Sequence, residues 1–219
     1  QEQGWPELTQ WFLQTFAAAH LRGISWRTIR DMVNGSTVVD LSGTALGVGA
    51  TSNVLNGIAL MATNLRLQKG IARNATIEGV APSWLPEVLR ADLAIQVGVD
   101  TKAITDAQIT SWLNARNISL QYVADWQTRA AGQPGNLATV KWPTSVNVLL
   151  YPAGTWFRAM QPVIELGVMY PKEQLQVNRY TRFFTEDAIA VGKRCNVSLN
   201  AKIPLGVNGA IGQRLATTG

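Results

Sequence analysis

The feature that most restricts the fold of this chain is its N-terminal segment, residues 5–33, which we expect to form one long helix. Pro6 suits the first helical position, and Glu7 favours the positively polarised N-terminal end. Asn34 and Gly35 then form a stop signal. Such a helix would span roughly 40 Å, which is long for a globular domain. Apolar residues at three- and four-residue steps predict an apolar stripe along it: Leu8, Trp11, Phe12, Phe16, Ala19, Trp26, Ile29 and Val33.

The remaining chain predicts an α+β protein, because helical patterns dominate its first half and strand patterns its second half. Thr105 and Gln108 have the spacing of a capping box at the start of one helix. The small residues of 42–53 predict a flexible linker, and residues 126–143 predict an exposed loop. Further helices are expected at residues 52–69, 83–98 and 105–116, and strands at 75–82, 118–125, 145–151, 155–159, 163–168 and 187–203.

Composition favours extensive contact with other subunits. Hydrophobic residues make up 47% of the chain and charged residues only 15%, whereas a typical domain has about 25% charged residues. No stretch approaches the roughly 18 to 20 apolar residues of a membrane-spanning helix, so subunit contact is the better account of the apolar excess. The net charge of +5, without long runs of charge, fits an assembly near nucleic acid better than a sequence-specific DNA reader.

Residues suited to catalysis or metal binding are scarce. His20 is the single histidine and is expected inside the long helix, whereas Cys195 is the single cysteine and is expected in a strand. Neither has a recognisable partner for nucleophilic catalysis, so we expect both to be structural. Residues 47–51 contain two glycines but lack the spacing and the lysine of a phosphate-binding loop. The sequence therefore predicts no catalytic residue, no cofactor and no metal site.

Aromatic and basic residues are interleaved in two segments, residues 156–158 and 179–184. Such segments can stack on single-stranded nucleic acid. They can also be strand residues that alternate between a core and a protein interface, where Trp and Arg are the usual anchors. We favour the interface interpretation.

Several segments follow one another in a distinctive order. The helical "WPELTQWFLQTFAAAHLRGISWRTIRDMV" precedes "VLNGIALMATNLRLQKG" and "AITDAQITSWLNARNISLQYVADWQ", and then come "VLLYPAGTWFRAMQPVIELGVMYP" and "FTEDAIAVGKRCNVS". In this order the chain resembles the major capsid proteins of tailed bacteriophages that infect actinobacteria. Those proteins have the Hong Kong-type capsid fold, which is also seen in encapsulins. The resemblance extends over about residues 6–212, and residues 75–117 and 149–194 are its most specific parts.

The resemblance implies a division of the chain between a peripheral and an axial domain. Residues 1–41 would hold the spine helix of the peripheral domain, and residues 42–160 the axial domain. Residues 161–195 would form the long peripheral strands, and residues 196–219 would return to the axial domain. Family members carry an N-terminal arm and an extended loop before the spine helix, which this sequence lacks, so we expect it to be a fragment.

The function implied by the resemblance is structural: a major capsid protein that assembles into the icosahedral head shell around phage DNA, and not an enzyme. Its partners would be itself, in pentamers and hexamers, packaged double-stranded DNA bound non-specifically, and scaffold, portal or decoration proteins, with no membrane. The expected location is the virion, after synthesis in the cytoplasm of a bacterial host. The residues expected at subunit contacts are Trp11, Arg22, Trp126, Arg158, Glu165, Lys172, Glu173 and Arg179.

Two other functions remain open at this point. An encapsulin-like compartment subunit would share the fold, and a cargo-docking groove would distinguish it. A basic nucleic-acid-binding module would show a salt-sensitive affinity for DNA while staying monomeric at high concentration. A hydrolase is a weaker alternative, since it would have to depend on His20.

Overall fold

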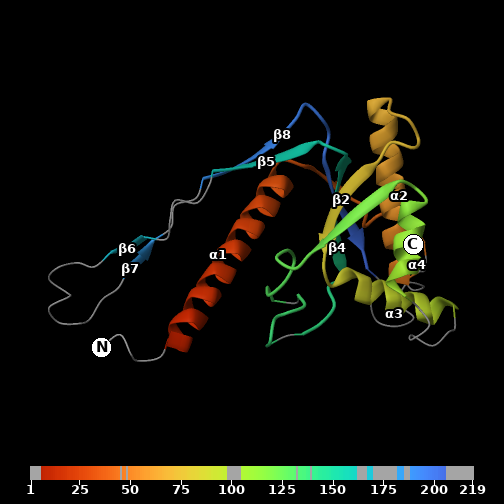
Figure 1. The fold of residues 1–219 in the computed structure, drawn as a ribbon. Coiled ribbons are helices and arrows are strands. Elements are labelled where there is room, and N and C mark those ends of the chain that lie inside the picture. Colours follow the sequence, from red (N-terminus) through yellow and green to blue (C-terminus); the bar gives the residue numbers. More distant parts are fainter. Residues whose placement is uncertain are drawn as a thin grey trace.

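The computed structural model describes residues 6–44, 46–47, 49–97, 105–131, 133–138, 140–161, 167–169, 182–184 and 188–205. It confirms a mixed α+β architecture, with helices in the first half of the chain and most strands in the second (Figure 1). The helices are α1 (Pro6–Asn34), α2 (Gly49–Lys69), α3 (Leu85–Val97) and α4 (Asp106–Asn114). The strands are β1 (Thr37–Asp40), β2 (Ile77–Pro82), β3 (Ile118–Val123), β4 (Ser145–Pro152), β5 (Trp156–Met160), β6 (Gly167–Met169), β7 (Arg182–Phe184), β8 (Ile189–Lys193) and β9 (Leu199–Pro204).

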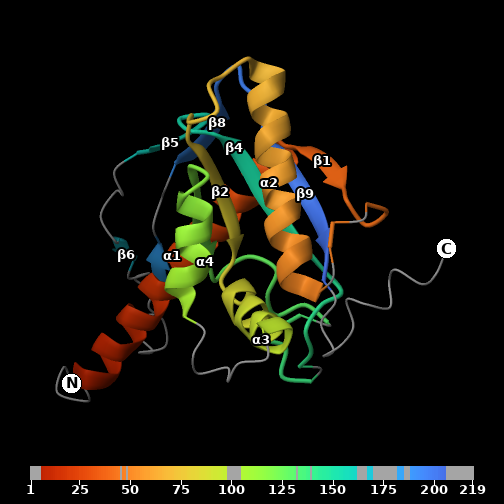
Figure 2. The same ribbon diagram turned by 90° about the vertical axis from the view of Figure 1, so that its right-hand side faces the viewer.

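The main sheet has five strands in the order β1-β9-β4-β2-β3. The outer pairs β1–β9 and β2–β3 are parallel, and β4 is antiparallel to both of its neighbours. Helices α2, α3 and α4 lie on one side of this sheet, as Figure 2 shows, and the C-terminal end of α1 lies on the other. One face of the sheet is therefore covered by three helices, and the other is partly covered by the end of α1 together with Trp126 and Trp156.

Strand β4 is buried on both faces. Val146, Val148 and Leu150 belong to the large core cluster that lies under α2, α3 and α4. Leu149 and Tyr151 point the other way, into a smaller cluster with Met32 of α1. A strand with apolar residues at successive positions is typical of a sheet that is covered on both sides.

Edge strand β1 is joined to β9 by side chains as well as by the ladder. Asp40 lies opposite Lys202 in the register, and the Lys202 Nζ atom donates to its carboxylate at 2.9 Å. Hydrogen bonds from Ser42 and Lys202 hold the pKa of Asp40 well below its usual value. The β1–β9 pair thus ties the segment that follows α1 into the main sheet.

The predicted linker over residues 42–53 is wrong in its second half, because Gly49 to Asn53 begin α2. Thr51 is buried, and its hydroxyl donates to the Leu89 carbonyl at 2.9 Å. The Asp92 carboxylate of α3 accepts the Thr51 backbone N–H at 2.8 Å, so it caps the N-terminal end of α2. A cap supplied by another helix leaves no local signal in the sequence, so the small residues alone predict a linker.

Two other local predictions need correction. Thr105 does occupy the N-cap position of α4, but its side chain forms no capping hydrogen bond, so the predicted capping box is absent. The predicted strand over residues 187–203 is two strands, β8 and β9, which belong to different sheets. Between them Asn196 accepts the Val197 N–H at 3.0 Å and donates to Thr155 Oγ1 at 3.0 Å, and this turn ends the first strand.

The predicted loop over residues 126–143 contains no helix or strand among its described residues, but its beginning is not exposed. The Gln127 side-chain amide exchanges two hydrogen bonds with the Asn147 backbone, at 2.8 and 2.9 Å. The Gln127 carbonyl also accepts the Trp84 indole N–H at 2.8 Å. Gln127 therefore continues the pairing of β4 beyond its last pair with β2, Val80 with Leu149, whereas Leu137 and Val140 further along are exposed.

Pairing between strands joins segments that the resemblance assigned to different domains. Strand β1, within residues 1–41, pairs with β9, and β5, within residues 42–160, pairs with β8 of residues 161–195. The assignment of these segments to peripheral and axial domains stays a prediction.

Truncation of the central strand should destabilise the whole fold. Leu150 is fully buried, so Leu150→Ala removes apolar contacts and leaves a cavity. We expect a loss of about 3 kcal/mol in the free energy of unfolding, measured by urea denaturation. Leu67→Ala, at a side chain that is 77% exposed, is the matched control and should change it by less than about 0.5 kcal/mol. Equal losses in the two variants would contradict the assignment of β4 as the centre of the core.

Tyr151 should make the fold sensitive to alkaline pH. Burial, with a smaller contribution from the nearby Glu78 carboxylate, raises the pKa of its hydroxyl from 10.0 to about 12. Because the folded state holds this proton more tightly, the stabilisation is complete below pH 10 and is lost as the pH rises towards about 12. The free energy of unfolding should therefore fall more steeply over this range in the wild type than in Tyr151→Phe, measured by urea denaturation at a series of pH values. Parallel curves would show that the Tyr151 hydroxyl is not responsible.

Candidate interaction surface

The C-terminal half of α1 is anchored to the rest of the chain. Ile24, Ile29 and Met32 are buried, and Met32 contributes to the smaller core cluster. Just beyond the helix, the Ser36 hydroxyl donates to the Met32 carbonyl at 2.7 Å and also forms a hydrogen bond of 2.7 Å with the Ser198 hydroxyl. Lys193 of β8 donates to the Gly35 carbonyl at 2.5 Å. These bonds fix where the helix leaves the main sheet.

Helix α1 also exposes large apolar side chains over residues 11–26. Trp11 and Leu21 are each 62% exposed, and Phe12 and Trp26 are also exposed. Figure 1 and Figure 2 both show the N-terminal end of the helix extending away from the main sheet. Large apolar side chains gathered on one exposed element mark an interaction surface more often than scattered ones do.

The apolar stripe predicted along this helix is therefore only partly covered by the chain itself. Ile29 is buried, and Phe16 and Val33 are half-buried, whereas Trp11, Phe12, Ala19 and Trp26 are exposed. The periodicity located the helix correctly but did not show which part of it faces the core. Leu21 was not in the predicted stripe, and its exposure has no signal in the periodicity.

A second exposed feature is the antiparallel ribbon of β5 and β8. It is separate from the main sheet, and β6 pairs with β7 further along the same two chain segments. Phe157, Arg158 and Met160 of β5 are exposed. An isolated ribbon of two strands is only marginally stable, so its exposed apolar groups fit a second contact surface.

The two aromatic residues of β5 lie on opposite faces. Trp156 packs against the smaller core cluster, and its indole N–H donates to Ser198 Oγ at 3.1 Å. The Trp156 ring lies against Gly35. A side chain at position 35 would place its Cβ atom 2.6 Å from a carbon of that ring. Phe157 packs over Gly192 on the ribbon and is 48% exposed. Trp156 thus joins the ribbon to the end of α1, and Phe157 remains available for a partner.

The structure places half of the predicted contact residues. Trp11, Arg22 and Arg158 are exposed, so their side chains are available to a partner. Trp126 is half-buried against the smaller cluster, so part of its surface is already used within the chain. The remaining predicted contact residues lie outside the described part of the chain: Glu165, Lys172, Glu173 and Arg179.

The single histidine and the single cysteine lie in separate parts of the structure. His20 lies in the middle of α1 with its ring stacked on that of Phe16, the centroids 6.5 Å apart. Cys195 is exposed, and it lies in the connection between β8 and β9 rather than in the predicted strand. Within the described ranges, no group of three or more His, Cys, Asp or Glu residues could hold a metal ion.

None of the described helices is both long and apolar enough to cross a membrane.

Comparison with known proteins gave no match to a protein family, to a curated protein or to a solved structure.

Removal of the Trp156 side chain should weaken the link between α1, the ribbon and the main sheet. Trp156→Ala deletes the contact with the smaller cluster and the hydrogen bond to Ser198, so we expect a loss of about 2 kcal/mol or more in the free energy of unfolding. Trp156→Phe keeps an aromatic ring and should cost about half as much or less. Phe157→Ala, on the exposed face, is the neighbouring control. Wild-type melting behaviour of Trp156→Ala would contradict this role.

Proposed function

We propose that this chain is the structural core of a phage major capsid protein, a subunit that assembles with copies of itself into a closed shell around DNA. The observation that carries the proposal is the large apolar surface along residues 11–26 of α1, which includes Trp11, Leu21 and Trp26. This surface has no cover within the described chain, and a helix that exposes it is better explained by a partner than by folding alone. The resemblance supplies the identity of that partner: further copies of the chain.

The elements of the subunit fall into a packed body and extended elements that could contact neighbouring copies. The main sheet and α2, α3 and α4 form a body with a well-packed core. Helix α1 and the β5–β8 ribbon extend from one side of this body, and Trp156 joins them. In a closed shell the same surfaces must pair in every copy, so a rigid body with extended contact elements is suited to the task.

Charge supports the proposal in a secondary way. The chain carries +5 at neutral pH, and many copies lining a shell would offset part of the phosphate charge of packaged DNA. This effect requires no reading of base sequence. The low proportion of charged residues, 15%, agrees with a subunit that buries much of its surface against neighbours.

Imaging of the full-length protein expressed alone tests the proposal. Negative-stain electron microscopy should show uniform closed shells. Small monomers at high concentration with salt-sensitive DNA affinity would contradict it and favour the nucleic-acid-binding module. In a second preparation, shells that take up a co-expressed cargo protein would favour an encapsulin-like compartment.

A double substitution on α1 tests the surface that carries the proposal. Trp11→Ala with Leu21→Ala removes apolar area from side chains that are exposed in the single chain, so the stability of the subunit should change by less than about 1 kcal/mol. Shell yield should fall about tenfold or more, because such apolar anchors dominate the free energy of association. Leu60→Ala, at an exposed position of α2, is the control and should keep its yield. Normal shells from the double variant would exclude this face of α1 as a major contact.

A further inference from the structure

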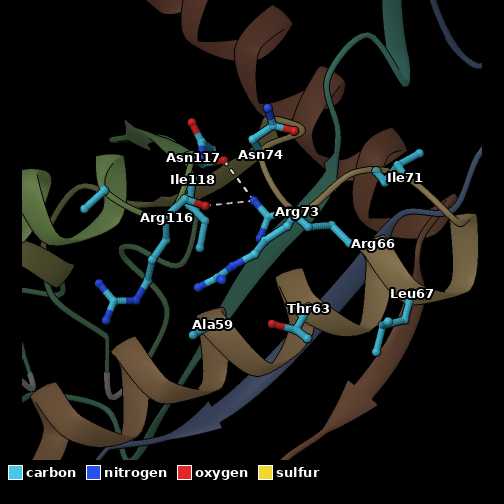
Figure 3. Close-up of a pocket in the computed structure, with 11 residues that line it drawn as sticks. Ala59, Thr63, Arg66, Leu67, Ile71, Arg73, Asn74, Arg116, Asn117 and Ile118 are labelled. Carbon is cyan, nitrogen blue, oxygen red and sulfur yellow. Dashed lines mark hydrogen bonds between the residues drawn. The ribbon is translucent and has the colours of Figure 1, made fainter.

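A groove of about 690 Å³ lies between the C-terminal end of α2 and the turn that connects α4 to β3. Figure 3 shows three arginines that reach it from different segments: Arg66 from α2, Arg73 from the α2–β2 connection and Arg116 from the α4–β3 turn. No aspartate or glutamate is among the described residues that line it. The groove therefore combines three positive charges with no lining carboxylate.

Arg66 forms the floor of the groove and holds its shape. Its guanidinium donates to the carbonyl oxygens of Ala75, Arg116 and Asn117, at 2.8 to 3.2 Å. Asn117 has a positive φ of 54°, and this tight turn brings its carbonyl and that of Arg116 towards Arg66. The bonds use Nε and Nη2, whereas Nη1 has no partner among the described residues.

Arg116 and Arg73 differ in how firmly they are held. The Arg116 guanidinium lies 3.6 Å from the centre of the Trp112 ring and donates to the Trp112 carbonyl at 3.0 Å, so its position is fixed before any ligand arrives. The Arg73 guanidinium is exposed and has neither a hydrogen bond nor an ion pair with any other described residue. Burial, and to a lesser degree the charge of Arg73, lowers the pKa of Arg66, as expected where no anion balances the two cations.

The groove also has an apolar side. Leu67 is 77% exposed at its edge, and the half-buried Ile71 contributes further aliphatic surface. A ligand that satisfies both sides needs an anionic group for the arginines and an aliphatic group for Leu67. A protein segment with Asp or Glu beside an apolar residue has both, whereas the phosphate backbone of duplex DNA presents anions without an aliphatic group and is too broad to enter a groove of this size.

We propose that this groove binds an acidic segment of a protein partner, with a carboxylate held by Arg73 and Arg116 over Arg66 and an apolar side chain packed on Leu67. Arginine is suited to this role because its planar fork can donate two parallel hydrogen bonds to one carboxylate. The inference does not depend on the capsid function, since any partner with such a segment would satisfy the groove.

Fluorescence anisotropy with a labelled, capped peptide of alternating Glu and Leu tests this inference on the full-length protein. The wild type should bind it saturably, and the same peptide with Gln in place of Glu should bind about tenfold more weakly or not at all. Arg73→Gln with Arg116→Gln should weaken binding of the Glu peptide by about tenfold or more. The matched control, Arg129→Gln with Lys141→Gln, removes the same charge at exposed positions in the loop after β3 and should change it less than about twofold.

A second variant distinguishes a direct loss of binding from a loss of folding in the double substitution. Leu67→Asp places a carboxylate at the exposed edge of the groove and leaves all three arginines in the sequence. It should also weaken binding of the Glu peptide, because it repels the carboxylates and removes the apolar contact. The thermal unfolding temperature should stay at the wild-type value. Three results would overturn the inference: no saturable binding by the wild type at millimolar peptide, equal losses in the groove and control variants, or tighter binding of a short DNA duplex than of the peptide through the same arginines. The last result would assign the groove to nucleic acid phosphate.

Discussion

The structure depends most on the burial of β4 on both faces and along both edges. Its odd- and even-numbered side chains enter two different core clusters, and its backbone pairs with β2 on one side and β9 on the other. Helices α2, α3 and α4 pack against one of these clusters, and the end of α1 packs against the other. Without this strand neither layer would have a surface to cover, so the positions of α1 and of the ribbon follow from it.

Single polar side chains then set how the elements are joined around this core. Arg66 binds three backbone carbonyls from two other segments, and Gln127 extends the pairing of β4 beyond its last pair with β2. Trp156 links the ribbon to Ser198 and to the end of α1. Each of these side chains forms hydrogen bonds with a segment far away in the sequence. These bonds specify how the helices and strands are placed against one another.

The sequence predicted the elements better than their environment. Periodicity and the stop signal located α1 within one residue at each end, because helix formation is decided by local patterns. It did not show that Trp11 and Trp26 are exposed, since exposure depends on what the rest of the chain covers. The cap of α2 by Asp92 and the break between β8 and β9 at Asn196 come from tertiary contacts, which local patterns do not encode. The groove around Arg66 was missed for the same reason: its three arginines come together only in the fold.

The strand order also dictates when this sheet can be completed. Strand β9 lies between β1 and β4, although more than 150 residues separate β1 from β9 in the chain. During synthesis from the N-terminus, β1 has no neighbour until residues 199–204 leave the ribosome, and contacts so distant in sequence form slowly. The exposed Trp11 and Leu21 of α1 are synthesised before β1 and remain exposed in the folded chain. Association between nascent chains through α1 is therefore a hazard while β9 is still to be made, and a chaperone that shields this helix would be of most use in that interval.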